Sequence, residues 1–275
     1  MSMEITFARY GDEAQLISLY RQCFPDGEEF WRWLLSQEPY RPENTLTLRE
    51  NGKIVSSLQM MPVTLRLHEE SYAAHYIYAA STLPQFQGRG LMGQLLEYAA
   101  REGLRRKQQF SVLIVEEPGL LSYYARFAYR PQIVWQYESA PASSSPLLPG
   151  EHLRKIQQED IPALHALYEA AAEKLLHGVR DNAHWERQLE LYGEGALLLE
   201  NAEGVKAYCF ADENGITEAV GKSAARLAAQ IAPGKAFRTV PEQGQFLPGG
   251  SIRPLTQAAD ALLKQQMVYL NLMYN

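Results

Sequence analysis

The sequence predicts a mixed α/β fold, in which one sheet carries helices on both of its faces. In the first half, a run of strand-like segments precedes a region where strand-like and helix-like segments alternate, which is typical of such a sheet. The second half begins with a weaker echo of the same pattern, after a segment rich in proline and serine. The chain has 275 residues, which is long for one compact domain, so two domains are expected.

The first half yields a complete order of elements from periodicity and turn residues. Helices are expected at 12–23, 28–35, 90–107 and 118–127. Strands are expected at 4–9, 45–49, 53–67, 74–81, 110–115 and 129–137. The helix at 90–107 is amphipathic, with one apolar stripe formed by Met92, Leu95, Leu96, Ala99 and Leu104.

The two halves resemble each other where each begins. Asp12 to Tyr20 and Asp160 to Tyr168 share the positions of their leucines and of the final tyrosine, and either aspartate can cap the helix that follows it. Each half then places a tryptophan on a second predicted helix, at Trp31 and Trp185. We interpret this agreement as an internal duplication, although leucines at helical spacing also agree by chance. The predicted organisation is a domain at 1–138, a linker at 139–150 and a domain at 151–275.

Composition and charge exclude several classes of protein. Apolar residues make up 46% and charged residues 21%, which is ordinary for a globular protein that buries a core. A net charge of -6 argues against a nucleic-acid partner. No signal peptide and no apolar run of membrane-spanning length is recognised, so no membrane partner is expected. Only two cysteines occur, without metal-ligand spacing, which favours the cytoplasm and no bound metal.

A glycine-rich loop is the main candidate site. The strand that ends near Ser81 is followed by Pro84, and Gly88, Gly90 and Gly93 then open the helix. Free backbone N–H groups at a helix start bind anions, and glycines allow a diphosphate to approach them. Arg89 can add a charge-assisted contact. The glycine spacing also fits a dinucleotide-binding loop, with Glu116 or Glu117 as the ribose-binding acid, but that fold requires a strand that runs directly into the first glycine. A tight turn without a ligand is the remaining alternative.

The loop resembles motif A of the GCN5-related N-acetyltransferases, whose pattern is Gln/Arg-x-x-Gly-x-Gly/Ala. Gln87, Gly88, Arg89 and Gly90 fit its first four places, and Met92 stands where a small residue is usual. The Arg-Gly-Leu-Met run is close to the Eis-like branch of the family. The resemblance implies that the backbone from Gly88 through Leu91 to Gly93 holds the pyrophosphate of acetyl-CoA, the co-substrate. It also implies that Thr82 and Leu83 line the pantetheine arm.

A second motif follows at Tyr124, where the family has Tyr-x-x-x-Gly-Phe. Ala128 replaces its glycine and Tyr129 its phenylalanine. The resemblance gives Tyr124 the role of general acid, which returns a proton to the thiolate of coenzyme A. Neighbouring Tyr123 competes for this role, and both tyrosines can instead be core aromatics at helical spacing.

The second half looks like a degenerate copy. A predicted strand at 215–220 is followed by Gly221-Lys222-Ser223 and a helix, with no glycine-rich loop. Tandem copies occur in Eis-like enzymes and N-myristoyltransferases, where the terminal carboxylate is the base, and Asn275 inherits that role as a hypothesis. A terminal strand that only completes a sheet is the alternative.

The resemblance carried by these residues implies an acetyl-CoA-dependent N-acetyltransferase. A primary amine of a small molecule or peptide attacks the thioester directly, an amide near Thr82 polarises the carbonyl and Tyr124 protonates the leaving thiolate. Two rivals are a non-catalytic acyl-CoA-binding module of the same fold and an acyltransferase that acts on tRNA or peptides. The sequence leaves the acceptor, the general base and the oligomeric state open.

Overall fold

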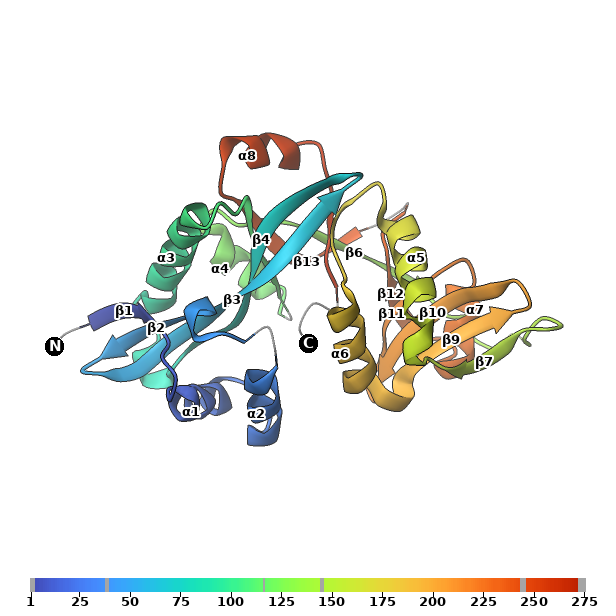
Figure 1. Cartoon of the computed structure of the whole chain (residues 1–275), viewed down its shortest axis with the longest axis horizontal. Coiled ribbons are helices and arrows are strands. Elements are labelled where there is room, and N and C mark those ends of the chain that lie inside the picture. Colours follow the sequence, from blue (N-terminus) through green and yellow to red (C-terminus); the bar gives the residue numbers. More distant parts are fainter. Residues whose placement is uncertain (1–2, 38–39, 116, 144–145, 243–245, 272–275) are drawn as a thin grey trace. The chain divides into compact units, whose positions relative to one another are not determined.

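The computed structural model of the chain describes residues 3–37, 40–115, 117–143, 146–242 and 246–271. These residues form two compact units (Figure 1). Unit 1 comprises Met1–Thr64, Tyr72–Arg130 and Ser251–Gln265, and unit 2 comprises Leu65–Ser71, Pro131–Gly250 and Gln266–Asn275. The division at 139–150 stays a prediction, and each unit takes residues from both sides of it.

Unit 1 is built on a sheet whose strands lie in the order β1-β2-β3-β4-β5. The strands are β1 (Met3–Phe7), β2 (Thr45–Glu50), β3 (Lys53–Leu67), β4 (Glu70–Thr82) and β5 (Phe110–Ile114). The helices are α1 (Glu13–Cys23), α2 (Glu28–Ser36), α3 (Leu91–Arg105) and α4 (Gly119–Ala125). In Figure 1, α1 and α2 lie on one face of this sheet, and α3 and α4 lie on the other. The mixed α/β prediction is therefore confirmed, and the predicted elements of the first half agree with the structure to within a few residues.

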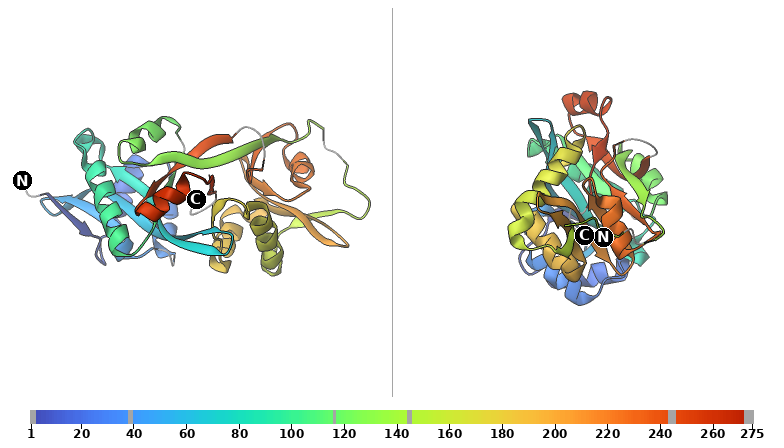
Figure 2. Two further views of the ribbon diagram at one scale, coloured as in Figure 1. Left: turned by 90° about the horizontal axis from the view of Figure 1, so that it is seen from above. Right: turned by 90° about the vertical axis from the view of Figure 1, so that its right-hand side faces the viewer.

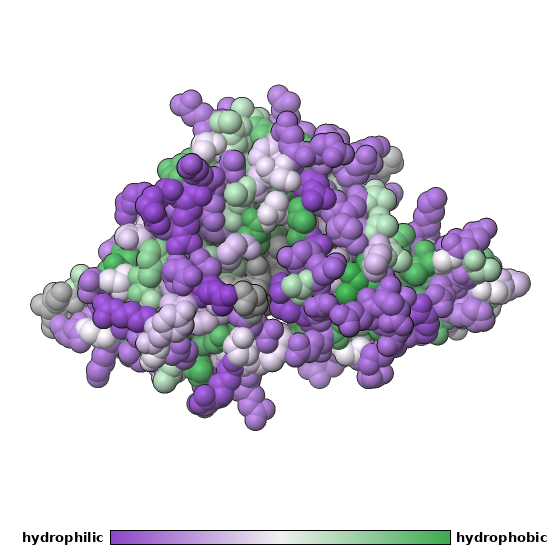
Figure 3. Space-filling model, viewed as in Figure 1, coloured by the Kyte–Doolittle hydropathy of each residue, from purple (hydrophilic) through white to green (hydrophobic). Residues whose placement is uncertain are grey.

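Each face of the unit 1 sheet has its own apolar core. On the α3 face the buried residues include Leu95, Leu96 and Ala99, as the helical stripe predicts. Leu104 was wrongly placed on that stripe, because Gly103 occupies the inward position and Leu104 is 48% exposed. The outer face of α3 is strongly hydrophilic in Figure 3. On the opposite face, α1 and α2 bury Tyr20 and Trp31 against the sheet.

Neither predicted helix cap forms. The carboxylate of Asp12 accepts a hydrogen bond from the backbone N–H of Arg9 (2.6 Å) and pairs with the Arg49 side chain. Asp160 accepts from the backbone N–H of Gln157 (2.8 Å) and pairs with Arg154. Each carboxylate therefore accepts from a backbone N–H three residues earlier and pairs with an arginine. No side-chain hydrogen bond caps α1 or α5 (Ile161–Ala172).

A segment from late in the chain completes unit 1. In the strand order β5 is followed by β13 (Phe246–Pro254), whose residues from Ser251 onward belong to this unit, as does α8 (Gln257–Leu263). Figure 2 shows α8, in red, among the blue and green elements of unit 1. Arg253 makes a two-point ion pair with Glu97 on α3 (2.8 and 3.1 Å). The late segment thus braces the helix that the glycine loop opens.

Unit 2 repeats the element order of unit 1, as the duplication predicts. Its strands β7, β9, β10, β11 and β12 take the places of β1 to β5, and α5, α6 and α7 take those of α1, α2 and α3. Antiparallel pairs join β9 to β10 and β10 to β11, whereas β11 and β12 are parallel. The bounds are β7 (His152–Lys155), α6 (Asn182–Tyr192), β9 (Ala196–Asn201), β10 (Gly204–Asp212), β11 (Gly215–Val220), α7 (Ala224–Ile231) and β12 (Ala236–Thr239).

Three further strands complete unit 2. They are β6 (Arg130–Ser139), β8 (Leu176–Gly178) and β14 (Val268–Tyr269). The strand β14 pairs in parallel with both β6 and β8. The predicted terminal strand therefore exists within the described residues, and it is fully buried.

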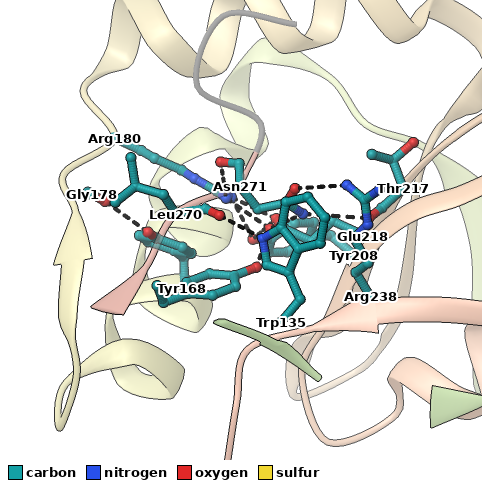
Figure 4. Close-up of polar contacts among 11 residues, drawn as sticks. Trp135, Tyr168, Gly178, Arg180, Tyr208, Thr217, Glu218, Arg238, Leu270 and Asn271 are labelled. Carbon is teal, nitrogen blue, oxygen red and sulfur yellow. Dashed lines mark hydrogen bonds and ion pairs between the residues drawn. The ribbon is translucent and has the colours of Figure 1, made fainter. Parts of the chain in front are cut away.

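A polar network lies at the centre of unit 2 (Figure 4). The fully buried side chains of Arg180 and Glu218 form a two-point ion pair at 2.6 and 2.8 Å. Tyr208 and Tyr269 both donate to the Glu218 carboxylate, at 3.1 and 2.5 Å. Arg180 also donates to the backbone carbonyl of Asn271 (3.0 Å). Burial opposes the charged form of Glu218, but the Arg180 guanidinium outweighs it and lowers the pKa of that carboxyl.

Candidate functional site

The site begins where the parallel strands β4 and β5 separate. Their register pairs Ala74, His75 and Tyr76 with Phe110, Ser111 and Val112. Beyond Tyr76, β4 continues to Thr82 and passes through Ala79, which has a φ of 47°. A positive φ is uncommon outside glycine, and inside a strand it marks a bulge-like irregularity. The two strands therefore diverge toward the glycine loop.

Hydrogen bonds fix the end of β4 and the start of the loop. The Ser56 hydroxyl donates to the Ser81 carbonyl (2.8 Å), and the Leu83 N–H donates to the Val55 carbonyl (3.0 Å). A short 3-10 turn follows at Pro84–Phe86. The side-chain amide of Gln87 then donates back to the Thr82 carbonyl (3.1 Å). This hydrogen bond fixes the path of the backbone from β4 into the glycine loop.

The loop itself has the geometry of an anion cradle. Gly88 and Gly90 have φ of 75° and 72°, values that side chains other than glycine adopt at a cost. The Gln94 N–H donates to the Gly90 carbonyl at 3.2 Å, which is the first turn of α3. The N–H groups of Leu91, Met92 and Gly93 precede this bond and have no intrahelical acceptor, so they can donate to a bound anion.

A cleft of about 700 Å³ opens between this loop and α4. Seven residues predicted from the sequence line it: Thr82, Gln87, Gly88, Gly90, Leu91, Met92 and Tyr124. Five further lining residues carried no assigned role in the sequence: Ala80, Phe86, Leu120, Arg126 and Phe127. Tyr123, the competing tyrosine, also lines it. Among the lining residues without an assigned role, Phe127 could have been found from the sequence, because it belongs to the second motif beside Tyr124.

Three predicted residues lie elsewhere. Leu83 lines a separate hollow beside α1, and Arg89 lies over the Phe86 ring. Gly93 lies where a Cβ atom would be 2.5 Å from a ring carbon of Phe127, so glycine there allows α3 and the α4 region to approach closely. Asn275 lies outside the described residues.

Tyr124 is half-buried beside the cleft. Its ring packs edge-on against Tyr123 (5.3 Å between centroids) and Tyr129 (6.0 Å). Burial, and then Tyr123, raises the pKa of Tyr124 to about 12. Within the described part of the chain its hydroxyl has no hydrogen-bond partner, so it is available to a ligand in the cleft. Ala128 has a φ of 60°, which explains why the related motif carries glycine at this place.

Neither cysteine has the properties of a nucleophile. Cys23 donates to the Thr82 carbonyl (3.4 Å), and burial raises the pKa of its thiol. Burial raises the pKa of Cys209 to about 12. Both are therefore thiols rather than thiolates at neutral pH.

Comparisons with known proteins give one family match and several similar solved structures. Residues 4–131 match the family model described as an acetyltransferase (GNAT) domain. A search with the sequence among curated proteins finds no match. No helix within the described ranges is long and apolar enough to cross a membrane.

Similar solved structures cover most of the chain. A GCN5-related N-acetyltransferase from Anabaena variabilis superposes with a TM-score of 0.71 at 16% identity, covering 94% of this chain and 74% of that one. Eis1 from Mycobacterium abscessus gives 0.66 at 13% identity, with 95% and 76% covered. Saccharomyces cerevisiae N-myristoyltransferase with bound myristoyl-CoA gives 0.59 at 12%, with 92% and 78% covered. These identities establish the fold alone. Residues 4–131 therefore match a GNAT acetyltransferase domain, and the fold of GCN5-related N-acetyltransferases extends over most of the chain.

Proposed function

We propose that the chain is an acetyl-CoA-dependent N-acetyltransferase of the tandem, Eis-like branch. The observation that carries the proposal is the cleft with the glycine loop on one wall and Tyr124 on the other. A diphosphate fits the N–H groups at the start of α3, and a thioester farther along β4 comes near the phenol. The neighbour with bound myristoyl-CoA supports an acyl-CoA ligand in this fold.

The proposed reaction is a direct transfer. A base takes a proton from a primary amine of a small molecule or peptide, and the nitrogen attacks the thioester carbonyl carbon. A backbone amide near Thr82 stabilises the oxygen of the tetrahedral intermediate. As the C–S bond breaks, Tyr124 donates its proton to the sulfur, which leaves coenzyme A and the N-acetylated amine. The proposed location is the cytoplasm, which the two free cysteines support.

Replacement of Gly90 by glutamate is expected to weaken acetyl-CoA binding about tenfold or more. The change forces a side chain into a φ of 72° and adds an anion to the diphosphate cradle, and like charges about 4 Å apart repel by about 1 to 4 kcal/mol. Isothermal titration of acetyl-CoA into both proteins measures the effect. Gly11→Glu is the matched control, because Gly11 has a φ of 96° and open space around it but lies outside the cleft.

The wild-type titration also tests the proposal as a whole. Absence of any binding by wild type would remove the acetyl-CoA assignment. Binding without turnover against a panel of amines would favour the non-catalytic module instead.

The base is proposed to be the terminal carboxylate of Asn275. Two residues appended after Asn275 are then expected to lower kcat about a hundredfold, within the usual range for a general base, with acetyl-CoA affinity unchanged. Asn275→Ala is the control, because it keeps the carboxylate and changes only the side chain. Unchanged turnover in the extended chain would assign the base to a side chain or to water.

A further inference from the structure

Arg89, which the sequence placed at the diphosphate, has other partners in the structure. Its guanidinium carbon lies 4.7 Å from the centre of the Phe86 ring, and Nη2 donates to the Gln85 carbonyl at 3.3 Å. Nη1 lies 3.8 Å from Oε1 of Glu50. The cleft is lined by Gly88 and Gly90, on either side of Arg89, but not by Arg89 itself. The positive charge of the loop is therefore turned away from the cleft.

Glu50 belongs to a different surface from the cleft. It ends β2, and with Gln85 and Phe86 it lines the hollow beside α1, which has a volume of about 1060 Å³. Phe86 lines both this hollow and the cleft, so its ring is a shared wall. Arg89 lies on that wall and reaches toward Glu50, whose side chain is 16% exposed. The Arg89 side chain is 51% exposed and can rotate without any change in the backbone.

We propose that Glu50 competes with the diphosphate of the cofactor for Arg89, and that Glu50 thereby limits cofactor affinity; this rests on the proposed acetyl-CoA function. The Arg89 guanidinium is half-exposed and lies 3.8 Å from the Glu50 carboxylate, beyond hydrogen-bond distance, so the pair contributes little to stability and Arg89 leaves Glu50 at low cost. A diphosphate carries more charge than one carboxylate and accepts two parallel N–H bonds from an arginine. Glu50 is a positioning residue, because it acts on the cofactor through Arg89.

If Arg89 moves from Glu50 to the diphosphate, Glu50 affects the affinity for ligands that carry a diphosphate. Glu50→Gln removes the competing charge and leaves Arg89 on Phe86 with an unopposed guanidinium. We expect acetyl-CoA to bind about two- to fivefold more tightly, which matches the usual strength of a weak ion pair near the surface. S-acetyl-pantetheine has the same thioester arm but no diphosphate, so its affinity is expected to be the same for both proteins. Isothermal titration of both ligands into the full chain measures the difference.

Three variants isolate the cause. Glu43→Gln removes one negative charge elsewhere in unit 1, on an exposed side chain, and is expected to leave both affinities unchanged. Arg89→Gln is expected to weaken acetyl-CoA binding, and adding Glu50→Gln to it is expected to give less gain than Glu50→Gln gives in wild type. Melting temperatures of all variants show whether the fold is retained.

Several outcomes would overturn the proposal. They are an unchanged acetyl-CoA affinity in Glu50→Gln, an equal gain for S-acetyl-pantetheine, or the same gain with Arg89 absent. Failure of wild type to bind acetyl-CoA is a different result, since it removes the proposed function itself. A gain that depends on Arg89 and on the diphosphate establishes the competition.

Discussion

Replacement of Arg180 by methionine is expected to lower the free energy of unfolding of unit 2 by about 3 to 5 kcal/mol. The guanidinium and the Glu218 carboxylate are both fully buried, so each is the charge partner that the other needs. Removal of Arg180 leaves a carboxylate in the core whose remaining donors, among the residues that the structure describes, are the hydroxyls of Tyr208 and Tyr269 and the Asn271 amide. Urea denaturation followed by tryptophan fluorescence measures the loss, since Trp135 and Trp185 lie in this unit.

Arg154→Met is the matched control for the burial of the charge. Arg154 also makes two-point contacts, to Asp160 and Glu200, but its side chain is 36% exposed. Its removal is expected to cost at most about 1 kcal/mol. The double variant Arg180→Met with Glu218→Gln is expected to recover part of the loss, because no net charge then stays buried. Equal effects of Arg180→Met and Arg154→Met would contradict a fully desolvated ion pair.

The same network is an example of a contact that the sequence could not predict. Arg180 and Glu218 are 38 positions apart along the chain, and neither forms a motif. The late segment from Ser251 to Gln265 joins unit 1 through Arg253 and Glu97, which are 156 positions apart. Local periodicity predicts elements, whereas partners at such separations are determined by tertiary packing. The cap predicted at Asp12 fails for the same reason, since Asp12 pairs with Arg49, 37 positions away.

The candidate site was more predictable than the packing, because glycines and aromatic residues carry local information. The spacing predicts the glycines at 88 and 90 as the loop, and both have a positive φ, which favours glycine. The direction of a long side chain has no such signal. The Arg89 side chain is directed by its contacts with the Phe86 ring and Glu50. The irregularity at Ala79 in β4 likewise has no glycine or proline in the sequence to indicate it.

Tyr124→Phe is expected to lower kcat about a hundredfold to a thousandfold, with little change in acetyl-CoA affinity. Loss of a positioned general acid usually costs a factor in this range. The variant keeps the ring that packs against Tyr123 and Tyr129 and removes only the hydroxyl. Steady-state kinetics with a reactive amine and titration of acetyl-CoA separate the effect on turnover from the effect on binding.

The pH dependence gives an independent test of the same residue. Burial raises the pKa of Tyr124 to about 12, so the phenol keeps its proton at neutral pH and up to about pH 10. A group with a raised pKa loses its proton only as the pH approaches that value, so ionisation of Tyr124 is not expected to reduce kcat between pH 7 and 10. A fall in kcat in this range that disappears in Tyr124→Phe would contradict the buried, protonated phenol.

Tyr123→Phe distinguishes the two adjacent hydroxyls. Tyr123 lines the same cleft and is packed against Tyr124, but the Arg126 guanidinium lies over its ring at 4.6 Å and turns it into part of a stacked surface group. Its hydroxyl is expected to contribute less than about threefold to kcat, since it then supplies no proton in the transition state. If Tyr123→Phe causes the large loss and Tyr124→Phe the small one, the general acid is Tyr123, and the cofactor sulfur lies near the Tyr123 hydroxyl.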